Sequence, residues 1–113
     1  MAYNRLMIII ETPIFTKQLL ATLTDKEYRQ LQENLLERPA AGAVIPGSGG
    51  LRKLRWIAEG RGKRGGTRLI YYWFSSQSVI LLLFIYPKNV QGDLKPGQLK
   101  QLSKIVEEEY REK

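Results

Sequence analysis

The feature of the sequence that most restricts its fold is an eight-residue run, Val79–Tyr86, in which every residue is apolar or aromatic. Side chains of a strand alternate between two faces, so a strand of this composition is apolar on both and has to be covered on both. The run is also much shorter than the ~20 residues that a membrane-spanning helix needs. It therefore predicts the central strand of a sheet in a globular domain.

Further strands are predicted beside this run. Thr67–Phe74 is rich in β-branched and aromatic residues, and only Ser75–Ser78 separates it from Val79, which indicates an antiparallel hairpin. Leu51–Glu59 alternates polar and apolar residues and predicts another strand, which reaches the hairpin through a glycine-rich basic segment, Gly60–Gly66. Three consecutive strands of a meander follow from this order.

The other elements are indicated by start signals and by periodicity. Leu6–Ile10 favours a strand, after which Thr12 and Pro13 supply an N-cap and a proline for the first helical turn. Thr24–Glu27 has the capping-box pattern of a second helix, and a last helix is expected from Lys95 or Pro96. Apolar residues recur at helical spacing in all three helices: Phe15, Leu19, Leu20 and Leu23, then Tyr28, Leu31, Leu35 and Leu36, then Leu99, Leu102, Ile105 and Val106.

The order β-α-α-β-β-β-α describes a small α+β domain with a mostly antiparallel sheet and helices packed on one side of it. Ala40–Gly50 is rich in glycine and proline and is predicted to be a loop between the helices and the meander. With 113 residues, the chain is expected to form a single domain over residues 1–113. We recognise no targeting or membrane-spanning segment, and we expect a cytoplasmic protein.

Cysteine and histidine are both absent. Their absence excludes disulfide scaffolds, thiol nucleophiles, zinc sites built on Cys or His, and Ser-His-Asp triads. An enzyme with this sequence has to move protons with Lys, Arg, Tyr or carboxylates. Gly60–Gly66 matches neither phosphate-binding loop pattern, so we expect no nucleotide cofactor. The consecutive carboxylates Glu107–Glu109 would point to different sides of a helix and fit paired-carboxylate catalysis poorly. We also expect no metal.

The net charge of +7 is concentrated in one segment. Leu51–Arg68 holds seven basic residues and one acidic residue, a net +6, against +1 for the rest of the chain. A charge excess confined in this way is typical of a surface that binds a polyphosphate such as RNA. The residues expected to bind the RNA backbone are Arg52, Arg61, Lys63 and Arg64.

Lys53 and Arg55 are two residues apart on a predicted strand and so lie on one face of it. Whether Arg68, on the neighbouring strand, shares that face depends on the register of the pair, which the sequence leaves open because the glycine-rich segment can absorb an extra residue. If the three converge, with Tyr86 and Lys88 at the end of the next strand, they form a site that holds a phosphate and stabilises extra charge on it. We therefore take Lys53, Arg55, Arg68, Tyr86 and Lys88 as candidate catalytic residues.

Three segments are familiar as a set: Gly49–Arg55, Gly60–Tyr72, and Tyr86–Asn89 followed by Asp93-Leu94. In these segments, within a match from about Met7 to about Lys104, the chain resembles the RelE/HigB family of toxins from bacterial toxin–antitoxin modules, particularly its HigB-like branch. It departs from that family at Pro87, where the family often has Ala or Gly, and at Val90, where the family often has Glu.

The resemblance implies a toxin that cuts messenger RNA on the translating ribosome and is neutralised by a protein antitoxin that binds DNA. It implies that Lys53 and Arg55 bind phosphate or take the proton of the 2′-hydroxyl, and that Arg68 stabilises charge in the transition state. Lys88 or Asn89, beside Tyr86, would take the place of a later basic residue of the family.

Two other functions fit the same residues. The fold is shared with toxins that inhibit DNA gyrase, so a gyrase inhibitor is one alternative. A non-catalytic module that binds RNA or the ribosome is the other, and it would show salt-sensitive binding without cut RNA ends.

Overall fold

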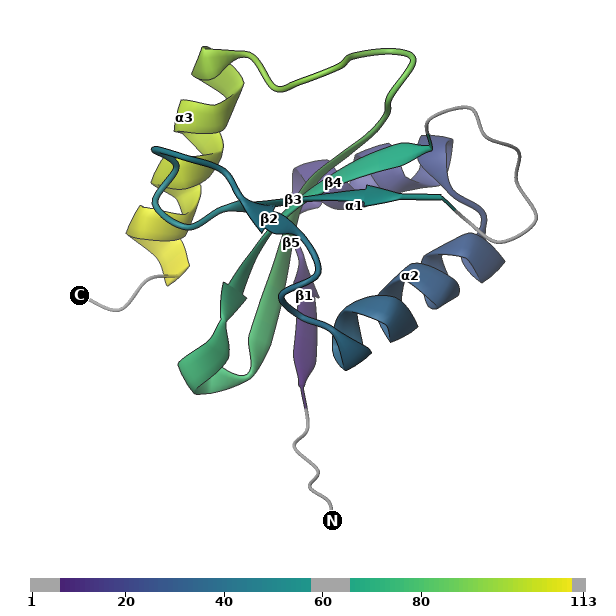
Figure 1. Ribbon diagram of the computed structural model, residues 1–113, viewed down its shortest axis with the longest axis horizontal. Coiled ribbons are helices and arrows are strands. Elements are labelled where there is room, and N and C mark those ends of the chain that lie inside the picture. Colours follow the sequence, from purple (N-terminus) through teal and green to yellow (C-terminus); the bar gives the residue numbers. More distant parts are fainter. Residues whose placement is uncertain (1–6, 58–65, 111–113) are drawn as a thin grey trace.

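The structure, a computed structural model, describes residues 7–57 and 66–110. A five-stranded sheet lies at its centre, in the order β1-β5-β4-β3-β2 (Figure 1). β1 runs parallel to β5, and the other neighbours are antiparallel. The strands are β1 (Ile8–Glu11), β2 (Ala43–Val44), β3 (Arg52–Trp56), β4 (Thr67–Phe74) and β5 (Val79–Pro87).

Two helices come early in the chain and one comes after the last strand. α1 (Pro13–Thr22) and α2 (Asp25–Glu37) separate β1 from β2, and α3 (Pro96–Ile105) follows β5 and continues into a π-helical turn, η2 (Val106–Tyr110). A short 3-10 turn, η1 (Ser75–Gln77), joins β4 to β5. The predicted α+β class and element order are confirmed, with one addition: the two-residue strand β2 forms inside the region expected to be a loop.

The helix starts have the predicted local causes. The Thr12 hydroxyl accepts a hydrogen bond from the Phe15 N–H at 3.3 Å, and Pro13 occupies the first turn of α1. Thr24 and Glu27 form a reciprocal capping box, in which each side chain accepts the backbone N–H of the other at 3.1 and 2.9 Å. These bonds satisfy backbone donors that a helix start otherwise leaves unpaired.

The sheet is covered on both faces, which corrects the expectation that all helices pack on one side. α1 and α2 cover one face, where Phe15 and Leu31 join the core with Leu82 of β5. α3 covers the other face, where Leu102 packs with Leu81 of β5. A single layer of helices cannot cover both faces of a strand that is apolar throughout, so the predicted double coverage of β5 itself requires a helix on each side.

β5 is an interior strand as expected, although β4 occupies the middle position of the sheet. Within the described ranges, no helix is both long enough and apolar enough to cross a lipid bilayer. On the face opposite α1 and α2, Leu102 of α3 lies in one cluster with Leu51, Ile70, Leu81, Leu83 and Tyr86. The same face, toward the start of β4, carries the candidate site.

Candidate functional site

Three of the predicted site residues stand side by side across three strands. Arg55 of β3 is directly opposite Arg68 of β4, and Arg68 is directly opposite Tyr86 of β5. Lys53 lies two residues from Arg55 on β3 and therefore on the same face. We call Lys53, Arg55, Arg68 and Tyr86 the basic row. The register that the sequence left open is thus the one that places Arg68 with Lys53 and Arg55.

The members of the basic row differ in exposure. Arg55 is exposed, whereas Arg68 is only 8% exposed and Tyr86 only 4%. A guanidinium buried in this way is largely removed from water, so its charge acts through a lower dielectric than a surface charge does. Packing also limits its movement. Arg68 is therefore the fixed centre of the row, and Arg55 is the member that faces solvent.

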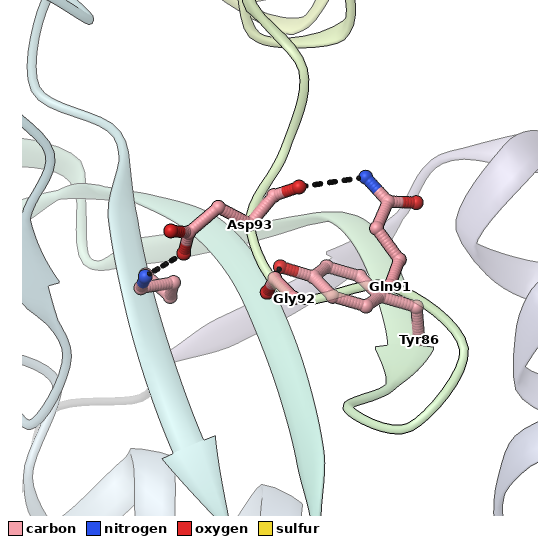
Figure 2. A network of polar contacts seen from close by, with 5 residues as sticks. Tyr86, Gln91, Gly92 and Asp93 are labelled. Atoms are coloured by element: carbon pink, nitrogen blue, oxygen red, sulfur yellow. Dashed lines mark hydrogen bonds and ion pairs between the residues drawn. The ribbon is translucent and has the colours of Figure 1, made fainter.

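Asp93 joins the basic row from the segment between β5 and α3. Its carboxylate accepts a hydrogen bond from the Lys53 ammonium, with 2.7 Å between Oδ1 and Nζ (Figure 2). The hydrogen bond from Lys53 and the charge of Lys53 hold the pKa of Asp93 below its ordinary value, and the charges of Arg55 and Arg68 act in the same direction. The cations of the row thus generate a positive potential at the position where this carboxylate lies.

Sequence reasoning did not include Asp93 among the site residues. It lies 40 positions from Lys53, and no local pattern relates two residues so far apart. One signal was present in the sequence, because Asp93 is the one carboxylate between the last strand and the last helix. A single acidic side chain in a basic surface region was a reason to ask which cation it meets.

The Tyr86 hydroxyl is oriented by the same segment. It donates a hydrogen bond to the Gly92 carbonyl at 3.1 Å, as Figure 2 shows. Burial raises the pKa of Tyr86, the charge of Asp93 raises it further, and Arg68 opposes the shift. Tyr86 therefore keeps its proton at neutral pH and is available as a hydrogen-bond donor or a proton donor.

Lys88 directly follows β5, two residues after Tyr86. Its side chain is exposed, and its backbone N–H donates to the Gly66 carbonyl at 3.0 Å, which joins the end of β5 to the start of β4. Gly66 has a φ of +64°, and a Cβ there would lie 2.4 Å from the Trp56 carbonyl oxygen. Gly66, the residue before β4, is therefore a position that only glycine fits.

Arg52 does not join the row. It shares the other face of the sheet with Leu54, where its guanidinium donates to the Gly42 carbonyl at 2.7 Å and stacks 5.9 Å from the centre of the Trp73 ring. Through these contacts, Arg52 holds the segment before β2 against the sheet. The other three residues that the sequence assigns to RNA binding, Arg61, Lys63 and Arg64, lie outside the described residues.

The arrangement is suited to an anion. Two guanidinium groups and an ammonium, on one face and within neighbouring strands, present several N–H donors to oxygen atoms of a phosphate. Arginine forks bind two such oxygens at once, and the phenol of Tyr86 adds a neutral donor beside them. A site of this kind can hold a phosphodiester and stabilise additional negative charge on it.

No protein-family model matches the sequence. Among solved structures, the chain is similar to a mutant form of the E. coli toxin RelE in the free state, with 15% identity, a TM-score of 0.56, and coverage of 86% of this chain and 93% of that one. It is also similar to a chain of the intact E. coli RelBE toxin–antitoxin complex, with 17% identity, a TM-score of 0.53, and coverage of 73% and 96%. A likeness at these identities is a likeness of fold. The chain has a RelE-like fold.

Proposed function

We propose that the protein is the toxin of a toxin–antitoxin module, of the HigB-like branch, and that it cuts messenger RNA on the translating ribosome. The observation that carries this proposal is the basic row, in which Arg55, Arg68 and Tyr86 are direct neighbours on three strands and Lys53 shares their face. The RelE-like fold and the resemblance of the sequence to the RelE/HigB family support it.

The proposed reaction uses the RNA's own 2′-hydroxyl as the nucleophile. The 2′-oxygen forms a bond to the adjacent phosphorus, the bond from phosphorus to the 5′-oxygen breaks, and the products carry a 2′,3′-cyclic phosphate and a 5′-hydroxyl. The attack is intramolecular, so its main requirement is orientation together with stabilisation of charge on the phosphate oxygens.

The residues of the row divide these tasks. Arg68, fixed and buried, stabilises the charge that develops on the phosphate. Lys53 and Arg55 bind the phosphate or take the 2′-hydroxyl proton, and Tyr86 donates a proton or a hydrogen bond toward the leaving oxygen. Lys88, exposed at the end of β5, binds a neighbouring phosphate. DNA lacks the 2′-hydroxyl and is not a substrate for this chemistry.

We further propose an antitoxin protein as the partner in the cell. The likeness to a chain of the RelBE toxin–antitoxin complex supports this part of the proposal. A partner that covers the basic row, or neutralises its charge, blocks access of the RNA backbone. The remaining basic residues, Arg61, Lys63 and Arg64, are proposed to bind the RNA backbone beside the row.

The test is primer extension on a reporter mRNA in a translation extract, beside the same RNA without ribosomes. A second reporter carries one 2′-deoxynucleotide at the mapped cut position. We expect cuts that need ribosomes and that disappear at the deoxy position. Cuts at the deoxy position would contradict the proposed nucleophile, and an uncut reporter in all reactions would contradict nuclease activity and favour the gyrase or pure binding alternatives.

A further inference from the structure

The segment between β5 and α3 crosses the basic row. Tyr86 on β5 binds the Gly92 carbonyl, and Lys53 on β3 binds the Asp93 carboxylate (Figure 2). β4 lies between these two strands in the sheet, so a segment held at both points passes over β4 on the face of the row. We call residues 88–95 the strap.

Leu94 of the strap packs against the core cluster around Leu102, whereas the contacts of residues 91–93 are polar and close to solvent. The Gln91 amide donates to the Asp93 carbonyl at 3.0 Å and to the Gln98 side chain of α3 at 2.7 Å. The Asp93 side chain is 81% exposed and that of Lys53 is 25% exposed, and Val90 is 74% exposed. An ion pair with so exposed a carboxylate adds little stability in water, since water solvates both charges well when they separate. The contact of Asp93 with Lys53 is therefore one that another anion can replace.

The Asp93 carboxylate lies on Lys53, one of the cations of the row that could bind a phosphate. Carboxylate and phosphate oxygens make the same kind of short, charge-assisted hydrogen bond with an ammonium or a guanidinium. The bond between Asp93 and Lys53, at 2.7 Å, has the length typical of this class. An ammonium has three N–H donors, but a carboxylate and a phosphate held beside the same ammonium repel each other, so Asp93 disfavours a phosphate on Lys53.

We propose that the strap is an autoinhibitory segment, in which Asp93 occupies the phosphate position on Lys53 and leaves when a phosphate group of the substrate binds. This inference rests on the proposed function for the identity of the substrate as RNA. The competition itself needs only a phosphate, and it is tested with one.

The experiment measures pyrophosphate binding by NMR titration of the folded protein at constant ionic strength. Asp93→Asn removes the competing charge and keeps the shape of the side chain, so we expect about two- to fivefold tighter binding. Gln91→Ala removes an anchor of the strap without any change of charge, and we expect a smaller gain in the same direction. Glu33 is exposed on α2, so Glu33→Gln is the matched control for the loss of one carboxylate. We expect it to bind pyrophosphate as the wild type does.

Three results would overturn the inference. One is unchanged binding in Asp93→Asn. Another is an equal gain in Asp93→Asn and Glu33→Gln together with no gain in Gln91→Ala, because that pattern would show only the general effect of net charge. The last is the lack of pyrophosphate binding even in Asp93→Asn. The nuclease proposal can fail separately. If Asp93→Asn binds pyrophosphate more tightly but the protein leaves RNA uncut, the autoinhibitory strap is supported and the nuclease proposal is contradicted.

Discussion

Asp93 is the residue whose protonation reports most directly on the basic row. Its pKa is held below the ordinary value mainly by the hydrogen bond from Lys53 and by the charge of Lys53. We expect Lys53→Gln to raise the pKa of Asp93 toward the ordinary range, with a residual lowering from Arg55 and Arg68. Titration of the Asp93 carboxyl carbon by NMR measures this, and a pKa that Lys53→Gln leaves in place would contradict the ion pair.

The same shift sets the sign of a pH effect on stability. A carboxyl whose pKa is lower in the folded state stabilises the fold above its unfolded pKa, and that stabilisation is lost as the pH falls through the lowered folded value. The wild type and Asp93→Asn should therefore differ most in free energy of unfolding near neutral pH and converge in acid. The difference should shrink in salt, because the pair is exposed.

Single residues of the site could be predicted from the sequence only in part. Alternation on a strand was enough to place Lys53 and Arg55 together, since it depends on neighbouring positions alone. The position of Arg68 needed the register across β3 and β4, which a glycine-rich connection does not determine. Asp93 and the strap needed tertiary structure, and Arg52, basic like its neighbours, turned out to face the opposite side.

At the scale of elements, the start of β4 depends on Gly66. A Cβ on Gly66 would meet the Trp56 carbonyl oxygen at 2.4 Å and the Ile57 side chain at 2.6 Å. We expect Gly66→Ala to lower the free energy of unfolding by about 2 kcal/mol or more, from a left-handed φ together with steric overlap. Urea unfolding measures the loss.

Gly47→Ala is the matched control for this change. Gly47 also has a positive φ, +71°, but a Cβ there would meet nothing within 4 Å. Its cost should be about 1 kcal/mol, the backbone strain alone. Equal losses in the two variants would show that the packing around Gly66 is not as tight as the structure has it.

Elements with strong local signals were predicted well. The N-cap at Thr12, the capping box at Thr24 and the hairpin of β4 and β5 all depend on residues close in sequence. The side of the sheet that α3 covers depends on the path of the strap, and no local pattern encodes it. The two-residue β2 was missed because its pairing with β3 comes from a loop folding back, not from strand propensity.

At the scale of the molecule, the concentration of charge predicts how RNA binding responds to salt. For single-stranded RNA, each phosphate that a cation neutralises adds about 0.7 to the magnitude of the slope of log affinity against log salt. Neutralising three RNA-binding cations by glutamine should therefore reduce that magnitude by about 2, as measured by fluorescence anisotropy. The test variant is Arg61→Gln, Lys63→Gln and Arg64→Gln, and the control of equal charge is Lys17→Gln, Lys26→Gln and Arg29→Gln on α1 and α2.

In the control, the exposed cations lie on the helices that cover the other face of the sheet, and the slope should change little. Equal reductions in both variants would mean that the RNA responds to net charge alone. In that case the assignment of Arg61, Lys63 and Arg64 to RNA binding would be wrong.

If RNA is cut at the basic row, the rate of reporter mRNA cleavage depends on Arg55, and primer extension in a translation extract measures that rate. Arg55 is exposed and Arg29 is exposed on α2, so Arg55→Ala and Arg29→Ala form a matched pair that should both stay folded by circular dichroism. We predict a loss of about 10²- to 10³-fold in Arg55→Ala, because Arg55 binds the reacting phosphate or takes the 2′-hydroxyl proton, and a wild-type rate in Arg29→Ala. Cleavage by Arg55→Ala at the wild-type rate would mean that RNA is not cut at the basic row.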